Sequence, residues 1–162
     1  MWQIPNTADP EIFSVFVSHS LAPRHEPLLI EFAELLTAHH MGCYIAERYS
    51  GSDTPQARRL INAIQNCNCL AAFITDNGAA LAHVRCEIAV ANVCGKFVIA
   101  IADHGLDLRN IEIDNCVFFN RGTRDGCTPL LPTLMRGLRC SDDQKARLCT
   151  AILGVVAGIR FG

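Results

Sequence analysis

The sequence is poor in charged and aromatic residues. Only 19% of its 162 residues are charged and 7% are aromatic, with one Trp and two Tyr. The formal net charge of −2 supplies no positive field for binding phosphates, so we expect no nucleic-acid partner. Because 50% of the residues are hydrophobic, the chain has enough apolar surface to fold, and global disorder is excluded.

Signal-peptide and membrane-spanning patterns are also missing from the sequence. Residues 1–6 contain neither a basic region nor an apolar one. The most apolar stretches, 88–102 and 151–159, are shorter than the roughly 20 residues that a membrane span needs. We therefore expect a cytoplasmic protein that does not interact with a membrane.

The nine cysteines lack the spacing of a disulfide framework or a zinc site. Their number is odd, and Cys67 and Cys69 are separated by one residue, whereas structural zinc sites use pairs separated by two or more. We expect reduced thiols and no metal site. Cys86 is expected in the core rather than as a nucleophile.

Three common catalytic motifs are absent. The sequence has no G-x4-GK[ST] phosphate loop, no G-x-G-x-x-G after its first predicted strand, and no G-x-S-x-G elbow. These absences argue against a Walker ATPase, an ordinary dinucleotide-binding fold and an α/β-hydrolase.

Apolar runs and helical periodicities alternate along the chain. The patterns predict strands over 12–17, 43–46, 69–75, 97–101 and 115–119, and helices over 26–40, 54–66, 79–94 and 141–159. Gly42 is expected to stop the first helix and Gly95 the third, and Ser141 with Gln144 forms a capping box before the last.

Such alternation specifies a parallel sheet covered on both faces, a three-layer α/β fold in one domain over 1–162. Ligands bind such sheets beyond the carboxyl ends of the strands, where the strand order reverses. The loops expected to hold a site are therefore 18–24, 47–54 and 75–78.

Glu87 is unusual because its predicted helix contains few polar residues. Its neighbours three and four positions away include His83 and Val84. One interpretation is a partly desolvated carboxylate with a raised pKa, suited to binding ribose hydroxyls or a developing glycosyl cation. The other is an exposed i,i+4 pair with His83. Composition alone leaves both open.

Two sequence blocks resemble Toll/interleukin-1 receptor (TIR) domains, especially bacterial ones. Residues 16–20, Phe-Val-Ser-His-Ser, resemble the F-[IV]-S-[HY]-[SA] signature, and residues 83–99 are similar to the S-x-W-V-x-x-E-I-x-x-A…G-K-x-V-I-P block. The resemblance covers 13–101 and places the family's BB loop at 49–55. It implies a flavodoxin-like sheet of five parallel strands in the order 2-1-3-4-5, with helices on both faces.

The resemblance also implies an activity. Many bacterial TIR domains cleave the nicotinamide glycosidic bond of NAD+ and release nicotinamide with ADP-ribose or a cyclic ADP-ribose isomer, so NAD+ would be the substrate and no cofactor is expected. The family's catalytic glutamate falls on Glu87, and its frequent tryptophan is replaced by His83. The residues expected to line the same site are Phe16, Ser18, His19, Ser20, Tyr49, Ser52 and His83.

Other interpretations stay open. Self-association or pairing with another TIR domain through 49–55 would make the chain a non-enzymatic adaptor, and a nucleoside 2-deoxyribosyltransferase-like enzyme would share the layout and a glutamate. Because no effector domain follows the TIR-like region, we expect any nucleotide product to signal to a separate effector protein, as in antiphage defence. Asp103 and His104 with Ser18 form a weaker triad candidate, and Arg58 with Arg59 is expected on a solvated helix face.

Overall fold

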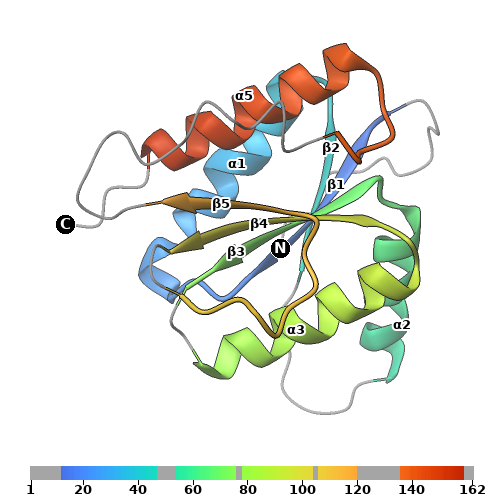
Figure 1. Ribbon diagram of the computed structural model, residues 1–162, viewed down its shortest axis with the longest axis vertical. Coiled ribbons are helices and arrows are strands. Elements are labelled where there is room, and N and C mark those ends of the chain that lie inside the picture. Colours follow the sequence, from blue (N-terminus) through green and yellow to red (C-terminus); the bar gives the residue numbers. More distant parts are fainter. Residues whose placement is uncertain (1–11, 47–53, 76–77, 104–105, 120–135, 159–162) are drawn as a thin grey trace.

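A computed structural model describes residues 12–46, 54–75, 78–103, 106–119 and 136–158 of the chain. Within these residues, strands and helices follow one another along the chain (Figure 1). They are β1 (Ser14–His19), α1 (Pro27–Ala38), β2 (Gly42–Ile45), α2 (Thr54–Asn66), β3 (Cys69–Ile74), α3 (Gly78–Val93), β4 (Phe97–Asp103), β5 (Asn115–Phe119) and α5 (Asp142–Gly158), with a short 3-10 helix η1 (Pro23–His25) before α1. Among these described elements, β4 is followed directly by β5.

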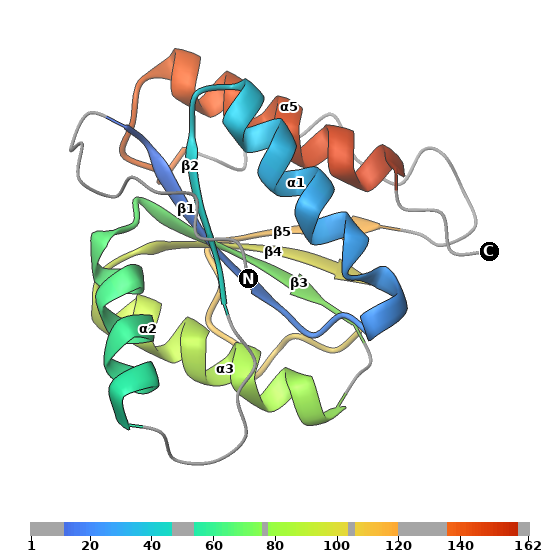
Figure 2. The ribbon, with the colours of Figure 1, turned by 180° about the vertical axis from the view of Figure 1, so that it is seen from behind.

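The five strands form one parallel sheet in the order β2-β1-β3-β4-β5. Helices α1 and α5 cover one face of the sheet, and α2 and α3 cover the other (Figures 1 and 2). The predicted flavodoxin-like three-layer α/β fold and its strand order are therefore confirmed.

Two apolar cores lie on opposite faces of the sheet, because side chains along a strand point alternately to either side. In β1, Val15 and Val17 belong to the core beneath α1 and α5. Phe16, between them, belongs to the core beneath α2 and α3. Burial on both faces explains why the strands read as continuous apolar runs rather than as alternating ones.

Helices α1 and α3 end in the same hydrogen-bonded arrangement, a Schellman motif. At the end of α3, the amide of Lys96 donates to Ala91 O at 2.8 Å and that of Gly95 to Asn92 O at 3.1 Å, with Gly95 at φ 69°. Gly95 thus ends the helix as predicted.

At the end of α1, the amide of Met41 donates to Leu36 O at 2.9 Å and that of His40 to Thr37 O at 3.0 Å, and His40 has φ 59°. The expectation that Gly42 stops this helix is wrong, because His40 occupies the left-handed position and Gly42 already belongs to β2. The prediction favoured Gly42 because glycine adopts a left-handed backbone conformation at the least cost.

The capping box before α5 is confirmed. The amide of Gln144 donates to Ser141 Oγ, and the amide of Ser141 donates to Gln144 Oε1, both at 3.1 Å.

In the described part of the chain, every helix is too short or too polar to span a bilayer.

Because α1 and α3 end in the same motif, replacing glycine at one end and introducing it at the other should change the free energy of unfolding in opposite directions. Gly95→Ala should lower the free energy of unfolding by about 1 kcal/mol, because an L side chain is strained at positive φ even though nothing lies within 4 Å of the added Cβ. His40→Gly relieves the same strain and should raise the free energy of unfolding by up to about 1 kcal/mol. Urea denaturation of both variants measures these changes, and a shift of equal sign in the two would contradict the assignment.

Candidate functional site

The strand order reverses direction between β1 and β3. The chain passes from β1 to β2 on one side and from β3 to β4 on the other, so the segments leaving β1 and β3 diverge. Such a switch point at the carboxyl ends of parallel strands is where open α/β sheets bind ligands. The residues at these ends are Ser18 and His19 on β1, Ser20 directly after it, and Thr75 directly after β3.

Glu87 lies on the side of α3 that packs against the sheet. Val84, Ile88 and Ala91 are buried on α3, and Glu87 falls within the stripe that this spacing defines. Only 3% of Glu87 is exposed, whereas His83 is exposed. The interpretation that places Glu87 on an exposed stripe is therefore wrong, and a carboxylate occupies a position where an apolar side chain would otherwise pack.

Ser18 connects β1 to this carboxylate. Its hydroxyl donates a hydrogen bond of 2.9 Å to Glu87 Oε2, between residues 69 positions apart in the sequence, and Ser18 is completely buried. A hydrogen bond to an ionised or buried carboxyl group offsets part of the cost of removing it from water. Sequence analysis placed both residues at one site, and the structure brings them into direct contact.

Small side chains surround Ser18 on the sheet. Ser18 pairs with Ala72, and Ala72 with Ala100, while the amide of Ala46, the residue after β2, donates to Val17 O beside it. The preceding row on the same face is large and consists of Tyr44, Phe16, Leu70 and Val98. The step from large to small side chains leaves room above the sheet for the Glu87 carboxylate.

Phe16 lies in the apolar core next to this site. It is completely buried, and its ring stacks on that of Tyr44 with centroids 5.3 Å apart and an interplanar angle of 17°. In this structure Phe16 has no surface that a ligand could touch. The structure thus places it beneath the site rather than in the lining that the TIR resemblance implied.

Ser20 ties the end of β1 to the end of β3. Its Oγ accepts a hydrogen bond of 2.8 Å from the amide of Thr75 and lies 3.2 Å from Thr75 O, and Thr75 Oγ1 donates to Ser20 O at 2.7 Å. Both residues are buried. These contacts give Ser20 a structural task at the switch point, fixing where the two segments leave the sheet.

His19 lies on the opposite face from Ser18, because neighbouring strand residues alternate. It pairs in register with Phe73, which belongs to the core beneath α1 and α5. Asp103 alternates in the same way from Ala102, so the structure does not bring Asp103 toward the Ser18 hydroxyl. The strand β1 continues through His19, two residues beyond its predicted end, and this extension decides the orientations of Ser18 and His19.

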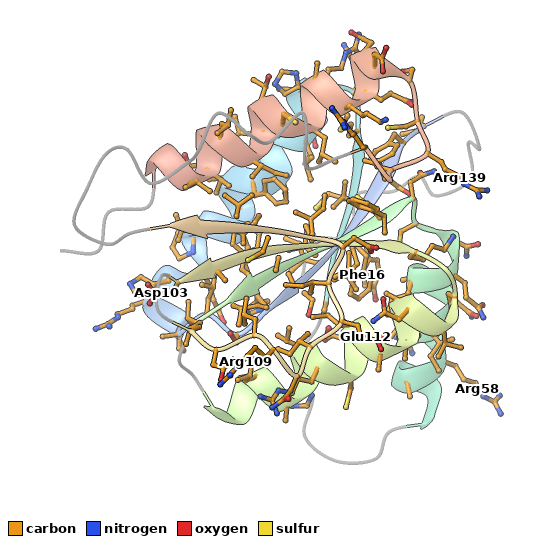
Figure 3. The ribbon with its side chains drawn as sticks, viewed as in Figure 1. Phe16, Arg58, Asp103, Arg109, Glu112 and Arg139 are labelled. Carbon is orange, nitrogen blue, oxygen red and sulfur yellow. The ribbon has the colours of Figure 1, made fainter. Side chains whose placement is uncertain are left out.

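The remaining predicted residues lie away from the contact between Ser18 and Glu87 or outside the described part of the chain. Figure 3 shows Asp103 at the end of β4, and Arg58 on the side of α2 that faces away from the sheet. Arg58 and Arg59 are exposed, which confirms the solvated helix face. Tyr49 and Ser52 lie outside the described residues, as does His104.

Burial keeps several cysteine thiols protonated. It raises the pKa of Cys43 to about 12 and that of Cys67 to about 11, and the pKa of Cys69 lies well above its usual value. Cys86 differs, because it is exposed on α3 beside Glu87, and its expected core position is wrong. Among the described residues, no group of His, Cys, Asp or Glu is arranged to hold a metal ion.

Sequence reasoning missed two features of the site. The first is the row of small side chains, which is visible only as alternation in runs such as Ile99-Ala100-Ile101 once the facing side is known. The second is the Ser20–Thr75 connection, which joins residues 55 positions apart and leaves no local signal.

Comparisons with known proteins give structural likeness alone. No protein-family profile and no curated protein sequence matches the chain. One similar solved structure is the CMP N-glycosidase BcmB of Clostridium botulinum, 15% identical over 70% of this chain and 92% of that chain, with a TM-score of 0.47. Another is the diflavin flavoprotein A3 of Nostoc sp., 12% identical over 91% of this chain and 92% of that chain, with a TM-score of 0.43. At these identities and TM-scores, neither likeness carries an argument about substrate or reaction.

Proposed function

We propose that this chain cleaves the N-glycosidic bond between nicotinamide and ribose in NAD+, with Glu87 as the catalytic carboxylate. The observation that supports the proposal is the buried Glu87, hydrogen-bonded to Ser18 at the switch point of the sheet. The choice of NAD+ rests on the resemblance of residues 16–20 and 83–99 to bacterial TIR domains.

The reaction asks little of the protein beyond electrostatic stabilisation. As the C1′–N bond breaks, its electron pair passes to the nicotinamide nitrogen, and the cationic ring leaves as neutral nicotinamide without needing a proton. Positive charge develops on the ribose ring, which becomes oxocarbenium-like. A single carboxylate beside C1′ and the ribose hydroxyls is suited to stabilise that charge.

Burial strengthens the proposed role of Glu87. The interaction between a carboxylate and a developing cation is larger where water is excluded and the effective dielectric is low. Completion of the reaction takes either water, which gives ADP-ribose, or a nucleophilic atom of the adenosine part, which gives a cyclic isomer.

In the proposed setting, self-association of the TIR-like domain precedes turnover, and a separate effector protein senses the product in antiphage defence.

Substitution of the proposed carboxylate tests this activity. Glu87→Gln keeps the side-chain shape but removes the negative charge, so nicotinamide release from NAD+ should fall by about 100-fold or more. The measurement is nicotinamide and ADP-ribose production over time, at several protein concentrations so that self-association is sampled. Glu34→Gln is the matched control, because Glu34 is exposed on α1 and should leave the rate unchanged.

Three outcomes would contradict parts of the proposal. Activity retained in Glu87→Gln would remove Glu87 from the mechanism. Exchange of bases between 2′-deoxynucleosides, without NAD+ cleavage, would assign the same carboxylate to a deoxyribosyltransferase-like enzyme. Absence of turnover on both substrate classes at every protein concentration would favour the non-enzymatic adaptor.

The exposed thiol beside Glu87 provides a second test. A mechanism that depends on the carboxylate requires nothing of Cys86, and substitution of an exposed residue has little effect on stability. We expect Cys86→Ser to keep NAD+ cleavage within about twofold of the unmodified protein. A loss as large as that of Glu87→Gln would instead indicate chemistry at sulfur.

A further inference from the structure

We propose that Ser18 is a positioning residue, which holds the Glu87 carboxylate in its productive orientation and does not itself contact the substrate. This inference rests on the proposed function and assigns to Ser18 a role different from the lining role that the family resemblance implied. The pairing of the Ser18 hydroxyl with Glu87 Oε2 at 2.9 Å carries it.

The burial of Ser18 favours a positioning role over direct contact with the substrate. Its side chain is completely buried, so in this structure a substrate finds no Ser18 surface to touch. A serine hydroxyl has a single hydrogen to donate. Because that hydrogen is directed at Glu87, Ser18 could donate to a substrate only after releasing the carboxylate.

The surroundings explain why a hydroxyl is needed at this position. Ala72 and Ala100 lie in the same row of the sheet as Ser18, Ala46 follows β2 beside Val17, and all three carry only methyl groups. The amides of β1 and β3 are engaged in the sheet ladder. In this part of the row the Ser18 hydroxyl is the group that donates to the Glu87 carboxylate, and Cys116 lies further along the row, beside Ala100.

A glutamate side chain has three rotatable bonds, and its carboxylate can turn about the last of them with little resistance. Catalytic groups act efficiently only when held close to the reactive geometry. The bond from β1 fixes one oxygen of Glu87 to a rigid central strand. By this argument, the sheet takes part in setting the orientation of the carboxylate that the helix carries.

The test uses two variants of equal shape. Ser18→Thr keeps the hydroxyl and Ser18→Val replaces it with a methyl group, so the pair differs only in the hydrogen bond. We expect Ser18→Val, and likewise Ser18→Ala, to lower kcat for NAD+ cleavage by about 10-fold to 100-fold with KM within about twofold. Ser18→Thr should recover most of the lost kcat.

A double variant tells whether Ser18 acts through Glu87. If it does, Ser18→Ala adds no further loss to Glu87→Gln, because the orientation of the missing carboxylate no longer matters. Additive losses, or a rise in KM with kcat unchanged, would show a direct substrate contact and overturn the inference. Equal kcat in Ser18→Thr and Ser18→Val would overturn it as well.

Two controls keep these outcomes separate from other failures. Circular dichroism and thermal unfolding of each variant identify any that do not fold, and the Thr and Val variants, which have the same volume, then replace the Ala variant in the comparison. An unmodified protein without turnover on any N-ribosyl substrate would refute the proposed function, and the role of Ser18 with it. A working enzyme that is indifferent to the Ser18 hydroxyl would refute the role of Ser18 alone.

Discussion

The burial of one carboxylate against the sheet is the constraint on which the site depends. Removing an ionised carboxylate from water costs several kcal/mol unless hydrogen bonds or charges compensate. In this fold the Ser18 hydroxyl supplies such a bond, and the small row beside it supplies the space. The apolar residues on either side of Glu87 hold α3 against the sheet, so the helix cannot turn the carboxylate outward without exposing its own core.

Most of the fold could be predicted from the sequence because its signals are local. Continuous apolar runs that alternate with helical periodicities over most of the chain indicate a parallel sheet without any knowledge of long-range contacts. The last helix was predicted correctly from a capping box of four residues. The end of α1 was not, because His40 adopts a conformation that its residue type disfavours, and propensity cannot show when tertiary packing enforces such a choice.

The sequence singled out Glu87 and Ser18, but it could not predict how their side chains are arranged. Glu87 stood out as a carboxylate in an apolar helix, yet two opposite environments fitted that pattern, and only the packing of α3 decided between them. The orientations of Phe16, Ser18 and His19 depend on strand alternation, so they become definite only once the extent of β1 is known. The Ser20–Thr75 connection joins the ends of two strands and could not be read from either segment alone.

The separation of the two apolar cores has a consequence for how this protein can change. The sheet stands between the Glu87 side and the layer formed by α1 and α5, and the buried residues of the described part of the chain form a separate apolar core on each side of it. Substitutions at distant sites without common partners have nearly independent effects. Substitutions in the α1 and α5 layer can therefore change its stability and surface while the packing around Glu87 beneath α3 stays the same.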